Sequence, residues 1–174
     1  MKYLVKFIVV TFLLVICTYA SAEQKIAYLD MKHVLNNSKA GKGAQDFLQK
    51  TFKENQKKFL EQEKSLKKEE TDLLAKKADL SKDEYQKKTD ELRKKVIDYQ
   101  SQRRSSLDKI TNQRAVARQE LLKKLDPIIK TYIKENNISL VIDKKNIIIG
   151  SDDHDITETI VEKLNKELPS LSLK

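Results

Sequence analysis

Residues able to bind a metal or to activate a nucleophile are few in this sequence. His33 and His154 are the only histidines, and neither stands at a metal-ligand spacing from other ligands. The run Asp152-Asp153-His154-Asp155 has the composition of a cation loop, but it lacks the spacing and the later glutamate of an EF-hand. Asp155 fits better as a helix N-cap, with Glu158 three residues later. No glycine-rich phosphate loop, nucleophile elbow or catalytic pair of carboxylates occurs. We therefore predict no catalytic site, metal site or cofactor, and the sequence favours a binding protein over an enzyme.

The first 22 residues have the pattern of a secretory signal peptide. Lys2 and Lys6 form a basic start, residues 7–16 are apolar, and a small-x-small cleavage pattern ends at Ala22. A membrane anchor is the alternative, but the apolar stretch is shorter than the roughly 20 residues of a spanning helix. We expect export and cleavage after Ala22, which would also remove Cys17, the only cysteine.

Short apolar segments at both ends of the mature chain predict a small body of strands and helices. Residues 25–30 form the first expected strand, followed by a brief helical turn at residues 34–35. Near the other end, residues 138–142 and 147–149 are rich in Ile and Val and flank a polar turn at residues 143–146. This pattern predicts a β-hairpin.

An amphipathic helix completes the expected body. It begins at a capping box over residues 155–158 and ends before Pro169. Three strands and about two helices leave apolar surface and an open sheet edge, so we expect the body to oligomerise. The candidate core and subunit-interface residues are Ile26, Tyr28, Leu140, Ile142 and Ile148.

The middle of the chain predicts a long helical hairpin. Residues 44–80 contain no Gly or Pro and consist mainly of strong helix formers. Ser81-Lys82-Asp83-Glu84 matches a capping box, which indicates a reversal near residues 79–82. One continuous helix with a coincidental Ser-x-x-Glu is the alternative. A second helix is expected over residues 82–136, with a kink, a break or a new start at Pro127.

The first helix of this hairpin has an unusually thin apolar stripe. Its regular apolar residues occur once every seven positions, whereas a core helix has about three per seven and a coiled-coil seam about two. Such a helix has little surface to bury. The stripe consists of Phe52, Phe59, Leu66, Leu73 and Leu80.

These patterns predict an α+β fold, in which a small β-body is built from both chain ends and a long antiparallel helical hairpin protrudes from it. The expected organisation is a signal peptide at residues 1–22, a body made of residues 23–43 and 115–174, and an arm at residues 44–114 with its tip near 79–82.

The excess positive charge is concentrated on the arm. The chain has a formal net charge of +9, and residues 50–114 contain 19 Lys and Arg against 13 Asp and Glu. Helix-surface ion pairs account for many of these charges but not for their segregation. Export argues against nucleic acid as the partner, which leaves an anionic membrane or lipopolysaccharide surface, or an acidic exported protein that exposes apolar segments when unfolded.

Apolar and basic side chains of the arm are the candidate contacts for such a client protein. For the aromatic residues, packing between the two arm helices is the alternative role. The candidates are Phe52, Phe59, Leu66, Tyr85, Tyr99, Lys57, Lys58, Lys67, Lys68, Lys87 and Lys88.

The order of these segments resembles the Skp (OmpH-like) family of periplasmic chaperones. The resemblance rests on residues 26–30, Val34-Leu35, residues 38–42, Leu140-Val141-Ile142-Asp143 and Asp155-Ile156-Thr157. It implies a homotrimer with a central β-barrel-like body and three hairpins that enclose a cavity. Unfolded outer-membrane proteins would be held there in the periplasm without ATP.

Gly43 departs from the family pattern, where better helix formers continue, and it makes the root of the arm a candidate hinge. The family's lipopolysaccharide binding has no residue-by-residue counterpart here. Two other functions stay open: an exported coiled-coil adaptor or spacer, which the sparse seam disfavours, and a basic binder of anionic lipid or lipopolysaccharide.

Overall fold

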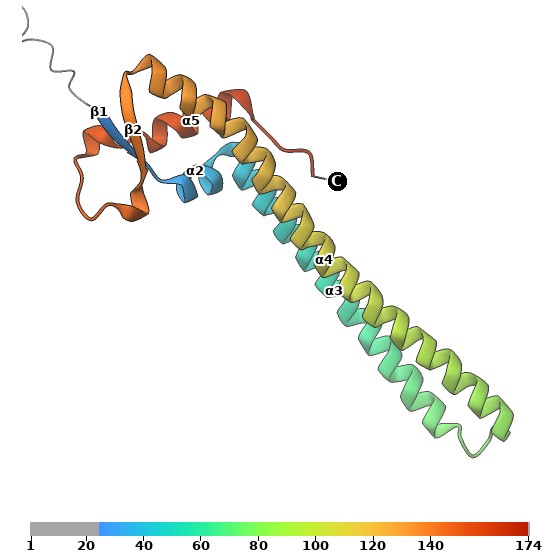
Figure 1. Ribbon diagram of the computed structural model, residues 1–174. Coiled ribbons are helices and arrows are strands. Elements are labelled where there is room, and N and C mark those ends of the chain that lie inside the picture. Colours follow the sequence, from blue (N-terminus) through green and yellow to red (C-terminus); the bar gives the residue numbers. More distant parts are fainter. Residues whose placement is uncertain (1–24, 174) are drawn as a thin grey trace, which may run out of the picture.

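The computed structural model describes residues 25–173 of the chain. The predicted signal peptide and its cleavage site lie outside these residues. Within this range, no helix has the length and apolar character needed to cross a membrane. A long pair of helices projects from a small group of shorter elements, and the C-terminal tail runs from this group to the side of the hairpin (Figure 1).

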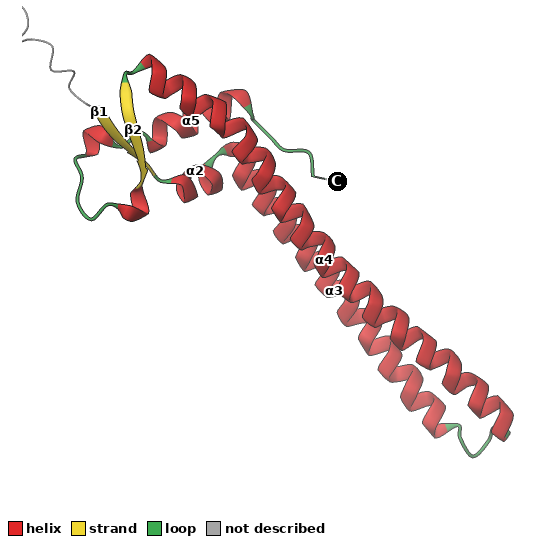
Figure 2. Ribbon diagram, in the orientation of Figure 1, coloured by secondary structure: helices red, strands yellow, loops and turns green. Residues whose placement is uncertain are grey.

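A two-stranded parallel sheet joins the two ends of the chain. Strand β1 (Lys25–Leu29) pairs with β2 (Ile138–Asp143), so that Ile26 lies opposite Leu140 and Tyr28 opposite Ile142. Figure 2 shows these strands crossing the body as the only sheet of the described chain. The fold is thus mostly helical, with a small sheet made from both chain ends, as the sequence predicts.

The predicted β-hairpin of residues 138–142 and 147–149 is wrong. After β2 the chain forms a 3₁₀ turn, η1 (Lys144–Asn146), and the following isoleucines pair with no strand of the described chain. The free edge of β1 is not open to them, because the Ile156 N–H donates to the Tyr28 carbonyl at 3.0 Å. Ile148 and Ile149 are therefore 98% and 91% exposed.

The core of the body lies between the sheet and three helices. Helix α2 (Met31–Asn37), helix α5 (Thr157–Glu167) and the last turns of α4 (Lys82–Glu135) contribute most of the buried side chains. Of the predicted core residues, only Tyr28 is buried within the single chain; Ile142 is half-buried, and Ile26, Leu140 and Ile148 are exposed. The fully buried side chains at the centre are Val34, Ser38, Leu125, Ile160 and Leu164.

Asp155 does not serve as the N-cap of the last helix, contrary to the predicted capping box. Its carboxylate accepts hydrogen bonds from the Thr157 N–H at 2.9 Å and from Lys144 Nζ at 2.7 Å, and the helix begins at Thr157. Burial acts to raise the pKa of Asp155, but the hydrogen bonds from Lys144 and Thr157 outweigh it and leave that pKa below its ordinary value. Glu158 contacts His33 at 2.8 Å instead of closing a capping box. Asp155 thus ties the loop after β2 to the start of α5.

The helical hairpin consists of α3 (Lys39–Ala75) and α4, joined by residues 76–81. The capping box at the turn is confirmed: the Glu84 N–H donates to Ser81 Oγ at 3.3 Å, and the Ser81 N–H donates to Glu84 Oε2 at 3.1 Å. With 37 residues, α3 is about 55 Å long.

The helix boundaries differ from the prediction at three places. Helix α3 starts before both Gly41 and Gly43, and it ends at Ala75 rather than at residue 80. Helix α4 continues through Pro127, so the predicted break or new start there is wrong. Leu125 and Ile128 on either side of Pro127 are buried in the core, and this packing offsets the loss of one backbone hydrogen bond.

The start of α3 packs tightly against the end of α2. Ser38 is fully buried and its Oγ accepts a hydrogen bond from the Gly41 N–H at 3.2 Å, which caps α3. A Cβ atom at Gly41 would lie 1.9 Å from the carbonyl oxygen of Leu35, so only glycine fits there. A Cβ atom at Gly43 would meet no atom within 4 Å. The hinge suggested for Gly43 stays a prediction.

We predict opposite effects for the same substitution at these two glycines. Gly41→Ala should lower the free energy of unfolding by about 1–3 kcal/mol, because the new methyl group overlaps a backbone atom. Gly43→Ala should raise it by about 0.5–1 kcal/mol, because alanine is the better helix former and the space is open. Urea unfolding followed by circular dichroism measures both values. A Gly41→Ala protein as stable as the unmodified chain would contradict the tight packing of α2 and α3.

Candidate functional site

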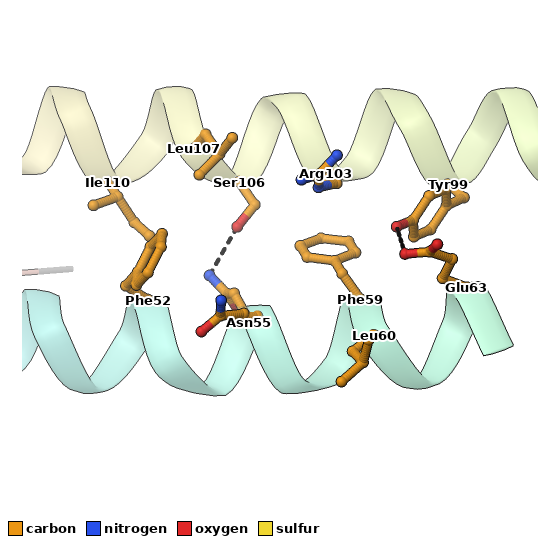
Figure 3. A pocket seen from close by; sticks show the side chains of 11 residues that line it. Phe52, Asn55, Phe59, Leu60, Glu63, Tyr99, Arg103, Ser106, Leu107 and Ile110 are labelled. Carbon is orange, nitrogen blue, oxygen red and sulfur yellow. Dashed lines mark hydrogen bonds between the residues drawn. The ribbon is translucent and has the colours of Figure 1, made fainter.

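Helices α3 and α4 meet along a narrow seam. Near its middle, the rings of Phe59 and Tyr99 pack edge to face, with centroids 6.0 Å apart. One turn closer to the body, Asn55 Nδ2 donates to Ser106 Oγ at 2.8 Å across the two helices. Figure 3 shows this alternation of aromatic and polar contacts, with Phe52 beside Ile110 at the next level. The seam therefore holds the helices together with little apolar burial.

The outer half of the hairpin is held by polar contacts. From residue 60 to residue 109 no side chain is buried, whereas Leu48, Phe59, Ile110 and Ala117 are buried nearer the body. Lys95 Nζ contacts Glu69 Oε2 at 2.6 Å between the helices. The outer arm is therefore polar and the root of the hairpin more apolar.

The predicted client-contacting residues divide into packed and free side chains. Phe59 is buried, and Tyr99 is half-buried in the seam, so for these two the packing role is the one observed. Leu66 and Tyr85 are half-buried, whereas Phe52 is exposed. The predicted lysines are all exposed, and they are Lys57, Lys58, Lys67, Lys68, Lys87 and Lys88.

Two hollows form a continuous groove along one side of the hairpin. The outer hollow, of about 380 Å³, and the inner one, of about 600 Å³, share Phe52 and Ile110 in their walls. Leu60 and Leu107 line the outer hollow and are exposed. Figure 3 shows that one comes from each helix. We call this surface the arm groove; it is lined by Leu48, Phe52, Leu60, Arg103, Leu107, Ile110, Arg114 and Arg118, among others.

The arm groove has a positive rim. Arg103, Arg114 and Arg118 line it, and none of them forms a salt bridge with a carboxylate of the described residues. Glu63, the one acidic residue among those that line the two hollows, accepts a hydrogen bond from Lys67, and this bond and the lysine charge lower the pKa of Glu63. The charge of Arg103 also helps to lower the pKa of Glu63. The rim thus offers guanidinium groups that form no salt bridge among the described residues, beside apolar side chains.

The sequence prediction missed Leu60, Leu107 and the three arginines. Leu60 lies beside the seven-residue stripe of α3, and the other four residues lie on α4, so a search for the stripe passes over all of them. Spacing of four residues is the signal that finds them. Phe52, Gln56 and Leu60 follow one another at this interval along α3. On α4, Leu107 follows Arg103 and Arg118 follows Arg114 at the same interval.

The acidic run near His154 forms no metal site. Within residues 25–173, no group of three or more His, Cys, Asp and Glu side chains is arranged to hold a metal ion. Asp152 to His154 form the short 3₁₀ turn η2 (Asp152–His154), and Asp155 is engaged by Lys144 and Thr157.

Comparison with known proteins places the chain in a family. The model of the family described as outer membrane protein (OmpH-like) matches residues 25–164, which is most of the chain. This chain belongs to the OmpH-like family. Among curated proteins, no significant match to the sequence is found.

A solved structure has the same fold. It is the crystal structure of a candidate outer membrane chaperone (OmpH-like) from Caulobacter crescentus CB15, at 2.83 Å resolution. The TM-score is 0.80, with 17% sequence identity, and the similarity covers 88% of this OmpH-like chain and 90% of the Caulobacter chain. The long hairpin and the small sheet are therefore shared at low identity.

The narrow seam yields a test at two neighbouring residues. Phe59→Ala should loosen the arm by about 2–4 kcal/mol locally, because it removes a ring that is 8% exposed and the edge-to-face contact with Tyr99. Leu60→Ala, at a side chain that is 51% exposed, should change stability by less than about 1 kcal/mol. Amide hydrogen exchange measures this: protection should fall in the arm of the Phe59 variant and stay unchanged in α5. Equal loss in both variants would contradict the assigned seam.

Proposed function

We propose that this OmpH-like protein is a periplasmic holdase chaperone that works without ATP. It binds unfolded outer-membrane proteins between cationic helical arms and prevents their aggregation on the way to the outer membrane. The observation that supports this most directly is the arm groove, an open apolar surface lined by three arginines on a long, mostly polar hairpin. The Caulobacter protein of the same fold, described as a candidate outer membrane chaperone, agrees with this role.

The charge of the arm supports an acidic client. The arm carries the surplus of Lys and Arg, and the predicted client-contacting lysines are exposed. Long-range attraction speeds the encounter with an acidic chain, and the exposed apolar side chains then hold it through short-range contacts. Neither step requires nucleotide or sequence recognition. This fits a protein that has to hold many different clients.

The working form that we propose is a homotrimer. An isolated two-stranded sheet is at best marginally stable in water, and this sheet exposes the opposed pair Ile26 and Leu140 on one face. The adjacent Ile148 and Ile149 are almost fully exposed as well. Copies of the same chain would cover these residues, extend the sheet, and bring three arms around one cavity. In this proposal residues 23–43 and 115–174 form the trimerising body, and residues 44–114 form the arm.

An aggregation assay tests the holdase function. A urea-unfolded outer-membrane β-barrel protein is diluted into buffer with purified residues 23–174, without nucleotide, and light scattering is followed as the chaperone-to-client ratio rises. We expect suppression that saturates near three chains per client. No suppression at large excess of folded protein would contradict the proposal. In that case, binding to anionic vesicles or to lipopolysaccharide would favour the lipid-binding function, and a specific envelope partner the adaptor function.

Native mass spectrometry tests the trimer separately. Ile148→Asp should shift the protein from trimer to monomer, because it would bury a charge at the subunit contact. Ile97→Asp is the matched control, since Ile97 is an exposed isoleucine on the arm. This variant should still have the native mass of a trimer. If the Ile148 variant is still a trimer, Ile148 and Ile149 are not part of the subunit interface.

A further inference from the structure

The two sides of the hairpin differ in chemistry. The arm groove exposes Phe52, Leu60 and Leu107 between three arginines. On the opposite side, the hollow is lined mainly by hydroxyl and amide side chains and two lysines, with Phe47 as its one exposed large apolar residue. That set comprises Phe47, Thr51, Lys58, Ser101, Gln102, Ser105, Lys109 and Gln113, together with the seam residues Asn55, Phe59, Ser106 and Ile110, which also line the arm groove.

We propose that the arm groove, and not the opposite side of the hairpin, is the binding site for clients, and that it takes an extended segment in which apolar and acidic side chains alternate. This inference rests on the proposed holdase function and adds to it the binding surface and the form of the bound chain.

The spacing of the helix turns supports an extended ligand. Phe52, Gln56 and Leu60 succeed one another at intervals of four residues, about 6 Å along α3. In an extended chain every second side chain recurs after about 6.6 Å. A strand lying along the groove therefore brings one side chain of a given face to each turn of α3. A helical ligand would need a wider apolar stripe than this groove provides.

The charge of the rim supports acidic positions in the same segment. Arg103, Arg114 and Arg118 all lie on α4, so an extended chain in the groove meets apolar side chains of both helices and has guanidinium groups along its α4 edge. Guanidinium groups bind carboxylates through paired hydrogen bonds, which a hydroxyl or amide side chain cannot replace. Strands of outer-membrane barrels alternate between apolar and polar side chains, and so fit both edges.

Site-specific photo-crosslinking distinguishes the two sides. A benzophenone amino acid is placed singly at Leu60 or Leu107 in the groove, and at Phe47 or Gln102 on the opposite side, one position on each helix. All four positions are exposed. Each protein is incubated with the urea-unfolded barrel protein and irradiated. We expect client adducts several-fold more abundant from the groove positions, with crosslinked client peptides drawn from its alternating strands.

A charge-matched pair of variants gives a second readout. Arg103→Gln/Arg114→Gln and Lys58→Gln/Lys109→Gln each remove two positive charges, from the groove and from the opposite side respectively. The arginine variant should bind client about threefold more weakly at low salt, since each exposed pair contributes modestly. The lysine variant should lose less, because it affects only long-range attraction.

The outcomes separate this inference from the function on which it rests. If the unmodified protein suppresses aggregation but adducts form equally on both sides, the arm groove is not the site while the holdase function stands. If the unmodified protein does not suppress aggregation, the function itself fails. Adducts between two chains of this protein at Leu60 or Leu107 without client would show that a second copy fills the groove, and would also overturn the inference.

Discussion

The parallel pairing of β1 with β2 is the contact on which the rest of the structure depends. It joins residues that are more than a hundred positions apart, so the chain between them has to travel out and return. A helical hairpin meets this requirement, with a capped turn at Ser81 and Glu84 for the reversal. Helix α4 has 54 residues against 37 in α3, so it continues about 17 residues past the root of the hairpin. Those residues, Leu121 to Ile133 among them, complete the core of the body.

The thin seam of the hairpin follows from two opposing needs. Enough apolar burial is required to hold α3 against α4, and the Phe59–Tyr99 contact with the residues near the root supplies it. More burial would close the groove, because Leu60 and Leu107 would then pack inward instead of facing solvent. Polar bridges such as Asn55 with Ser106 and Lys95 with Glu69 hold the helices in register without covering that surface. The polar side chains keep the arm soluble, and the limited apolar burial between the helices leaves apolar side chains accessible.

Local signals in the sequence predicted the long helices, the capping box and the first strand, because each depends on residues within a few positions. Three features depended on distant contacts and were missed. The Ile147–Ile149 segment has strand propensity but no strand of its own chain to pair with, Pro127 is tolerated because its neighbours are buried, and Asp155 is held by Lys144. For the candidate site, Phe52 and the exposed lysines lie as predicted, while the groove residues beside the stripe depend on how α3 and α4 face each other.

The direction of the arm groove is set by the body. Helix α4 runs without interruption from Arg103 at the groove to Leu125 in the core, so Arg103, Arg114 and Arg118 keep a fixed rotation about the helix axis relative to the sheet. The start of α3 is held against α2 by the buried Ser38 cap, and α4 continues into the core of the body. The geometry of any assembly that forms through the exposed face and edge of the sheet therefore also fixes the direction that each arm groove faces. A trimer that turns them inward gathers three apolar, arginine-lined surfaces around one client, while the hydroxyl-rich sides face the solvent.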